Sequence, residues 1–323
     1  MKLAFATAAL LLAGSAIADT PYVPADTPQG SGPYPAVMLQ EPGLPTHTVY
    51  RPAKLDAPGM GKLPIIAWGN GACVNVGNRF RPFLSEIASH GYIAIAVGPI
   101  GPPQAETVAS SSMVRGKPSA VSSAGKRTAS SPKLDYIPSD TAASQLTDAI
   151  DWAIAENKRP GSPYFGKLDT AKIAVMGQSC GGLQASAAAR DPRVSVLGIW
   201  NSGLFDNAQH IKDIADADVS KAALPSLHVA SIYITGDPAH DQAYKNAESD
   251  FAVVSGPSVR AWRENTPHAG TYREPNGGAF GPVAVAFLDW HLKGEQKAAR
   301  MFTGPDCTLC KQPEWHVRTK NVD

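Results

Sequence analysis

The sequence has no strong imbalance of charge. Its 29 lysine and arginine residues nearly match its 28 aspartate and glutamate residues, which leaves a formal net charge of +1, and no long block carries a single sign. Proteins that bind nucleic acid or an anionic membrane surface usually present a concentrated basic patch. The composition therefore argues against nucleic acid as a partner.

Long apolar runs are also missing beyond the first residues. No segment after residue 18 approaches the roughly 20 consecutive apolar residues of a membrane-spanning helix. The first 18 residues resemble a cleavable signal peptide, because Lys2 precedes an apolar stretch over residues 3–12 and Ala16 and Ala18 form an A-x-A cleavage pattern. We expect cleavage after Ala18, a secreted or periplasmic protein, and no membrane span.

Motifs for cofactors are absent as well. The sequence contains no phosphate-cradling glycine loop, no haem motif and no set of metal ligands at useful spacing, so it predicts neither a cofactor nor a bound metal. Cysteine is scarce, with four residues at Cys73, Cys180, Cys307 and Cys310. Export would permit disulfides among them, in one of three pairings.

Short apolar runs alternate with amphipathic segments from residue 46 onward. Runs that are apolar throughout are typical of strands covered on both faces, and their alternation with helical patterns predicts an α/β fold with a doubly wound, mostly parallel sheet. We expect strands near residues 46–50, 63–68, 92–97, 173–176, 194–200, 230–235 and 258–263, and helices near residues 79–90, 139–157, 183–190 and 283–292.

The segments outside this alternation are rich in Pro, Gly and Ser. Residues 19–323 are expected to form one domain, which begins with a Pro/Gly-rich extended arm over residues 19–45. Residues 98–138 indicate a surface loop, although a long loop beside a site can also act as a lid. Residues 298–323 are expected to form a C-terminal tail.

Residues 173–182 read Ile-Ala-Val-Met-Gly-Gln-Ser-Cys-Gly-Gly, a β-rich run that ends in a Gly-x-Ser-x-Gly turn centred on Ser179. Such a turn from strand to helix is tight and strained, so Gly177 and Gly181 must lack side chains. A serine hydroxyl there becomes a nucleophile when an imidazole takes its proton and a carboxylate orients the imidazole. The alternative is an ordinary glycine-rich turn. Whether the sequence also offers a suitably placed histidine and carboxylate decides between the two interpretations.

The elbow resembles that of the α/β-hydrolase superfamily, in which the acid and the histidine follow the serine in that order, each on a loop behind a strand. Among the eight histidines, His268 directly follows the strand expected at residues 258–263 and precedes the last expected helix. The resemblance therefore identifies His268 as the base. The simpler alternative is a polar loop residue exposed to water.

Three aspartates are candidates for the acid. Asp241 lies far enough beyond the strand expected at residues 230–235 to reach under the histidine, and we favour it. Asp237 precedes a proline and has a simpler role in shaping the turn. Asp206 follows the preceding strand, which is an alternative position for the acid in this fold.

An oxyanion hole requires two backbone N–H donors. The resemblance implies that one belongs to Cys180, the residue after the serine, and that the other comes from the loop Trp68-Gly69-Asn70-Gly71, where we favour Asn70. The alternative is that Gly69-Asn70-Gly71 is merely a turn. If the two loops meet, Cys73 and Cys180 can form a disulfide, and Cys307 would then pair with Cys310. The alternative is that Cys73 and Cys180 are buried free thiols.

Over about residues 46–297 the chain is similar to the secreted branch of the superfamily that contains dienelactone-hydrolase-like, platelet-activating-factor-acetylhydrolase-like and polyester-hydrolase enzymes. This resemblance implies a secreted serine hydrolase that cleaves small or polymeric carboxylic esters through an acyl-enzyme. A peptidase or amidase on the same fold and a non-catalytic binding protein are the alternatives. Trp200, with the segment Trp200-Asn201-Ser202-Gly203 that it begins, and Tyr272 are candidates for the substrate pocket, and both fit the core equally well.

Overall fold

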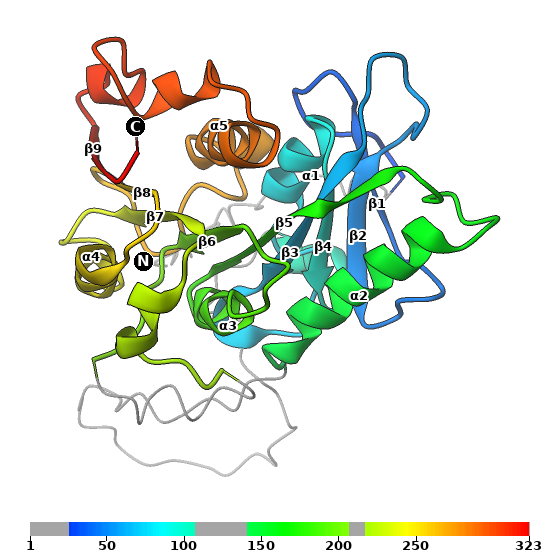
Figure 1. The fold of residues 1–323 in the computed structure, drawn as a ribbon, viewed down its shortest axis with the longest axis horizontal. Helices are drawn as coiled ribbons and strands as arrows, with labels where there is room; N and C mark the ends of the chain where they lie inside the picture. Colours follow the sequence, from blue (N-terminus) through cyan, green and yellow to red (C-terminus); the bar gives the residue numbers. More distant parts are fainter. Residues whose placement is uncertain (1–25, 107–140, 207–216, 323) are drawn as a thin grey trace, which may run out of the picture.

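The computed structural model describes residues 26–106, 141–206 and 217–322, which form an α/β fold (Figure 1). Within these ranges nine strands make one mostly parallel sheet in the order β1-β2-β4-β3-β5-β6-β7-β8-β9, so the predicted fold class is confirmed at that level. The expected signal peptide and residues 107–138 of the expected loop or lid lie outside the described residues. The strands are β1 (Ala36–Leu39), β2 (His47–Pro52), β3 (Leu63–Gly69), β4 (Ile93–Val97), β5 (Leu168–Gln178), β6 (Val196–Trp200), β7 (Ala230–Gly236), β8 (Ser258–Arg263) and β9 (Trp315–Lys320).

The middle of the sheet, from β4 to β8, is parallel. All residues of β3, β4, β6 and β7 are buried, as expected for strands that helices cover on both faces. The apolar character of these runs therefore follows from their position, and it is the reason that the sequence alone located them.

Helices cover the two faces of the sheet in two groups (Figure 1). One hydrophobic core joins α1 (Arg81–Ser89) and α5 (Phe280–Leu292) to one face. The other core joins α2 (Ser144–Lys158), α3 (Cys180–Ala188) and α4 (Tyr244–Val253) to the opposite face.

The two groups follow from the path of the chain through the sheet. From β3 the chain moves to β4 on one side, and it then returns to β5 on the other side of β3. Because parallel crossovers are right-handed, this reversal moves the helices to the opposite face. At this reversal the carboxyl ends of β3 and β5 lie next to each other, which is where α/β proteins usually bind their ligands.

Two segments that the sequence predicted to be irregular contain edge strands. β1 lies within the expected arm and pairs antiparallel with β2, and β9 lies within the expected tail and pairs antiparallel with β8. β8 is therefore not the last strand. In β9 only Trp315 is fully buried, so the strand lacks the continuous apolar run that marks the central strands.

Six aromatic rings pack together beneath the carboxyl ends of β3 and β6, with ring centroids 5.1–6.4 Å apart. They form part of the core under α1 and α5. This aromatic cluster consists of Trp68, Phe80, Phe83, Trp200, Tyr272 and Phe280.

Candidate active site

Ser179 lies between the end of β5 and the first residue of α3, with φ 53° and ψ −119°. A non-glycine residue in this region is strained, which is typical of residues held in place for a function. The flanking glycines allow the close approach: a Cβ on Gly177 would overlap the carbonyl group of Gly181, and one on Gly181 would overlap that of Gly69. This is the steric reason that the sequence predicted.

The side chains of His268 and Asp241 meet Ser179 from two other loops. His268 follows β8, and its Nε2 lies 2.8 Å from Ser179 Oγ. Its Nδ1 lies 2.7 Å from Oδ1 of Asp241, which follows β7. The His268 side chain is 22% exposed while that of Asp241 is fully buried. The three residues singled out from the sequence therefore form one hydrogen-bonded chain with its serine end toward solvent.

The Asp241 carboxylate is stabilised in its charged form. Burial by itself raises the pKa of Asp241, but the hydrogen bond and charge of His268, the N–H of Ala243 and the amide of Asn201 outweigh it and hold that pKa below its ordinary value. An ionised carboxylate at Nδ1 fixes the imidazole with Nε2 free to accept a proton from Ser179.

The other two candidate acids lie elsewhere. Asp237 bonds to the ring Nδ1 of His240 at 2.8 Å and accepts the N–H of Ala239, so it shapes the turn, which is the simpler role expected for it. Asp206 is 86% exposed and pairs with Lys221 at 2.8 Å. Neither carboxylate has a hydrogen bond with His268 in the described part of the chain.

Side chains that the sequence did not single out hold the histidine loop in place. Gln178, the last residue of β5, donates its side-chain amide to the backbone oxygen of His268 at 3.0 Å. The N–H of His268 donates to the backbone oxygen of His240 at 3.2 Å. Only the position of Gln178 next to Ser179 could have pointed to it.

The two residues proposed as oxyanion donors come from loops that touch. Cys180 is the first residue of α3, and the first N–H groups of a helix have no intrahelical acceptor. The Asn70 nitrogen would lie 2.7 Å from a Cβ on Gly181, which places β3 directly against the first turn of α3. The side-chain amide of Asn70 is already engaged, because Nδ2 donates to the backbone oxygens of Val74 and Val76 in the following loop and of Val97 at the end of β4. The donor that Asn70 would offer an oxyanion is therefore its backbone N–H and not its side-chain amide.

A disulfide joins these loops. Cys73 is bonded to Cys180 with their Cα atoms 5.3 Å apart, and Cys307 is bonded to Cys310 with a Cα separation of 5.2 Å. Both expected pairings are present, and the alternative of free thiols is wrong. Ala72 and Cys73 both have left-handed backbones, with φ 55° and 48°, so the loop turns sharply where the disulfide holds it.

Trp200 and Tyr272 are both 0% exposed and belong to the aromatic cluster, so they lie in the core and not on an accessible wall. The structure adds a residue that the sequence missed: Asn201, which hydrogen-bonds to both Asp241 and Tyr272. The sequence indicated the segment Trp200-Asn201-Ser202-Gly203 only as a candidate lining of the substrate pocket, and nothing in its pattern points to a contact of Asn201 with the acid.

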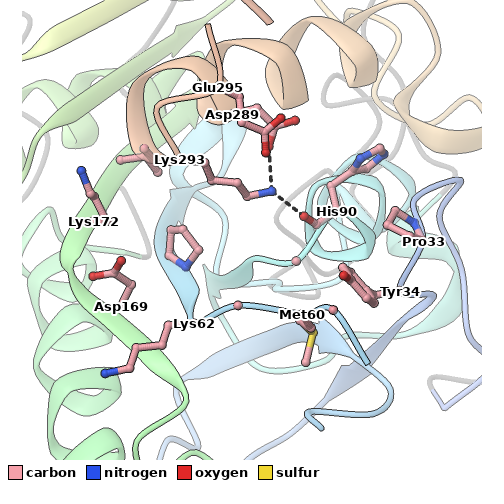
Figure 2. Close-up of a pocket in the computed structure, with 15 residues that line it drawn as sticks. Pro33, Tyr34, Met60, Lys62, His90, Asp169, Lys172, Asp289, Lys293 and Glu295 are labelled. Carbon is pink, nitrogen blue, oxygen red and sulfur yellow. Dashed lines mark hydrogen bonds and ion pairs between the residues drawn. The ribbon is translucent and has the colours of Figure 1, made fainter. Parts of the chain in front are cut away.

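A pocket of about 540 Å³ lies at the amino ends of the central parallel strands, opposite the end where Ser179 lies (Figure 2). Its walls include Lys62, Gly91 and Asp169, which stand at the starts of parallel strands, whereas Ser179 stands at a carboxyl end. On one side of the pocket the Lys293 ammonium lies between Asp289, with which it pairs at 2.7 Å, and the backbone oxygen of His90, to which it donates at 2.6 Å (Figure 2). The pocket is therefore separate from the candidate active site.

A scan against protein-family models and a search of curated proteins gave no match for this chain. Among the described residues, no group of three or more His, Cys, Asp or Glu side chains is placed to hold a metal ion. None of the helices in the described ranges is long and apolar enough to cross a bilayer.

Proposed function

We propose that this chain is a secreted serine hydrolase with an α/β-hydrolase fold, which cleaves carboxylic esters through an acyl-enzyme. One observation carries the proposal: the hydrogen-bonded chain from Ser179 through His268 to Asp241, with distances of 2.8 Å and 2.7 Å. The strained turn at Ser179 and the nearby N–H of Cys180 support it, because acyl transfer needs a nucleophile that is exposed to the substrate and N–H donors for the developing oxyanion.

In the proposed reaction, Ser179 Oγ attacks the ester carbonyl carbon and its proton passes to His268 Nε2. Asp241 stabilises the imidazolium, and the N–H groups of Cys180 and Asn70 stabilise the negative oxygen. The C–O bond to the alcohol then breaks, and the alcohol leaves with the proton from Nε2. Water attacks the acyl group in the same way, its proton passes through His268 to Ser179, and the carboxylic acid is released.

An ester is the simplest substrate for this arrangement, because an alcohol leaves more readily than an amine and needs no acid other than His268. Secretion is proposed from the leader pattern of residues 1–18, and two disulfides are compatible with an oxidising compartment.

The experiment replaces the nucleophile. We expect Ser179→Ala to lower the turnover of a p-nitrophenyl ester by roughly 10³-fold or more and to abolish labelling by a fluorophosphonate probe. Ser186→Ala is the matched control, because its buried hydroxyl on α3 donates to the Gly182 carbonyl at 2.9 Å and takes no part in the hydrogen-bonded chain of Ser179. Undiminished turnover in Ser179→Ala, or a wild-type protein that takes no label, would contradict the proposal.

A further inference from the structure

Asp241 bonds to a second side chain that the proposed reaction does not use. Asn201 donates from Nδ2 to Asp241 Oδ2 at 2.7 Å, and its own Oδ1 accepts a hydrogen bond from the hydroxyl of Tyr272. All three side chains are buried, and Asn201 and Tyr272 are 0% exposed. The hydrogen-bonded chain from Ser179 therefore continues beyond the acid into the core.

The backbone around Asn201 is shaped for this contact. Asn201 directly follows β6 and has φ 42°, a left-handed conformation that asparagine tolerates better than most residues. A Cβ on Gly270 would lie 2.9 Å from Asn201 Oδ1 and would overlap the ring of Tyr272. The loop that carries His268 thus leaves room for both side chains.

Tyr272 determines which end of the amide faces the acid. Its ring packs against Phe80, Phe83 and Phe280 in the aromatic cluster, and burial together with the charge of Asp241 raises its pKa well above the ordinary value, so the hydroxyl keeps its proton. A hydroxyl that donates to Oδ1 requires the NH₂ group of Asn201 to point at Asp241. The flipped amide would set an oxygen against the carboxylate.

The donors to Asp241 are few and each has its own place. Oδ1 receives His268 and the N–H of Ala243 at 2.9 Å, while Oδ2 receives Asn201 and the N–H of Gly236 at 3.0 Å. Loss of the Asn201 amide would leave Oδ2 with a single donor, and the carboxylate could turn away from His268.

We propose that Asn201 is a positioning residue for the acid and that Tyr272 locks its amide in the orientation that points Asp241 Oδ1 at His268. This inference rests on the proposed ester hydrolysis.

The test compares pH profiles of kcat/KM for p-nitrophenyl acetate. Asn201→Asp keeps the size of the side chain and tolerates the left-handed backbone, but it sets a second carboxylate against Asp241. A nearby negative charge favours the protonated base, so we expect the acidic limb of the profile to move up by about one pH unit, with kcat lowered about tenfold and KM changed less.

A second variant removes only the hydrogen bond from the Tyr272 hydroxyl to Asn201. We expect Tyr272→Phe to lower kcat about fivefold, as for the loss of one buried hydrogen bond. Tyr233→Phe is its matched control, because Tyr233 is equally buried and its hydroxyl has no hydrogen-bond partner among the residues that the structure describes. This control should keep the wild-type kcat and profile.

A folded Asn201→Asp with the wild-type acidic limb would overturn the inference. If Asn201→Asp does not fold, Tyr272→Phe decides: a kcat equal to that of Tyr233→Phe overturns the inference, and a selective fall in kcat supports it. Failure of the proposed function is distinct, because it would appear as wild-type activity that does not depend on Ser179.

Discussion

At Gly181 the structure leaves no room for a side chain. A Cβ there would overlap the carbonyl group of Gly69 at the end of β3 and would lie 2.7 Å from the Asn70 nitrogen. These are backbone atoms of a central strand and its following loop, so they cannot rotate away as the end of a long side chain could. A methyl group would push α3 away from β3.

We therefore expect Gly181→Ala to lower the free energy of unfolding by about 1–3 kcal/mol, as overpacking usually does, and to lower esterase activity as well. Gly61→Ala is the control, because nothing lies within 4 Å of a Cβ at that position. Urea denaturation and p-nitrophenyl ester assays of both variants measure the effect. A Gly181→Ala protein as stable as Gly61→Ala would show that the two loops do not approach so closely.

The sequence located Ser179, Asp241 and His268 because each follows an apolar run that is easy to identify. It could not locate Asn201 or Gln178, because their roles depend on which loops meet in space. A hydrogen bond between residues 201 and 241 leaves no trace in the local pattern of either segment.

At the scale of elements, the disulfide from Cys73 to Cys180 joins the short 3₁₀ helix η1 (Gly71–Cys73) to the first residue of α3. The bonded cysteines are 107 residues apart in sequence, whereas Cys307 and Cys310 are three apart. In the chain-entropy model, the long loop corresponds to about 5 kcal/mol of stabilisation and the short one to about 2 kcal/mol.

We expect the variant Cys73→Ser/Cys180→Ser to lose at least tenfold in kcat, because both proposed oxyanion donors would lie on loops that are no longer joined. The variant Cys307→Ser/Cys310→Ser serves as the control and should keep its kcat. Steady-state assays below the melting temperature of each variant, with thiol titration to verify the remaining disulfide, make the comparison. Equal kcat values in the two variants would count against a role in positioning the donors.

The elements that the sequence missed share one property. β1 and β9 are edge strands, and of the six residues of β9 only Trp315 is buried. An edge strand needs one apolar face at most, so its pattern is weak and its pairing depends on a partner far away in sequence. The central strands could be identified from their continuous apolar runs alone, without knowledge of the strands that they pair with.

At the scale of the whole molecule, a buried acid links stability to pH. Asp250 on α4 accepts the N–H of Leu204 at 2.7 Å and lies 3.5 Å from Lys221. Burial dominates over these contacts and raises the pKa of Asp250 to about 7. The folded protein therefore binds a proton that the unfolded chain has already released above about pH 4.

Because the folded state holds this proton more tightly, the stability that Asp250 contributes is present in acid and is lost as the pH rises toward 7. We expect the free energy of unfolding of the wild type, relative to Asp250→Asn, to fall by on the order of 3 kcal/mol between pH 4 and pH 8. Denaturant titrations at several pH values measure this difference. Asp306 is exposed, so the difference in free energy of unfolding between the wild type and the control Asp306→Asn should not change in this way with pH. If the free energies of the wild type and Asp250→Asn change in parallel with pH, Asp250 does not hold a proton in the folded state at neutral pH.

The overall architecture was the easiest feature to predict, because the alternation of apolar runs and helices fixes an α/β sheet before any contact is known. The order of the strands was not accessible in the same way. The return from β4 to β5 across β3 decides that the loops after β3 and β5 meet, and only the structure displays it.

The pairing of β9 with β8 has a consequence for how this chain is made. The backbone groups along one side of β8 stay open until a segment more than 50 residues further on has been synthesised, since Ser258 faces Lys320 in the register. During that interval β8 presents a free edge of the kind that recruits strands from other molecules. A chain that ends between α5 and β9 would therefore expose β8 as an unpaired edge strand and would be prone to aggregate.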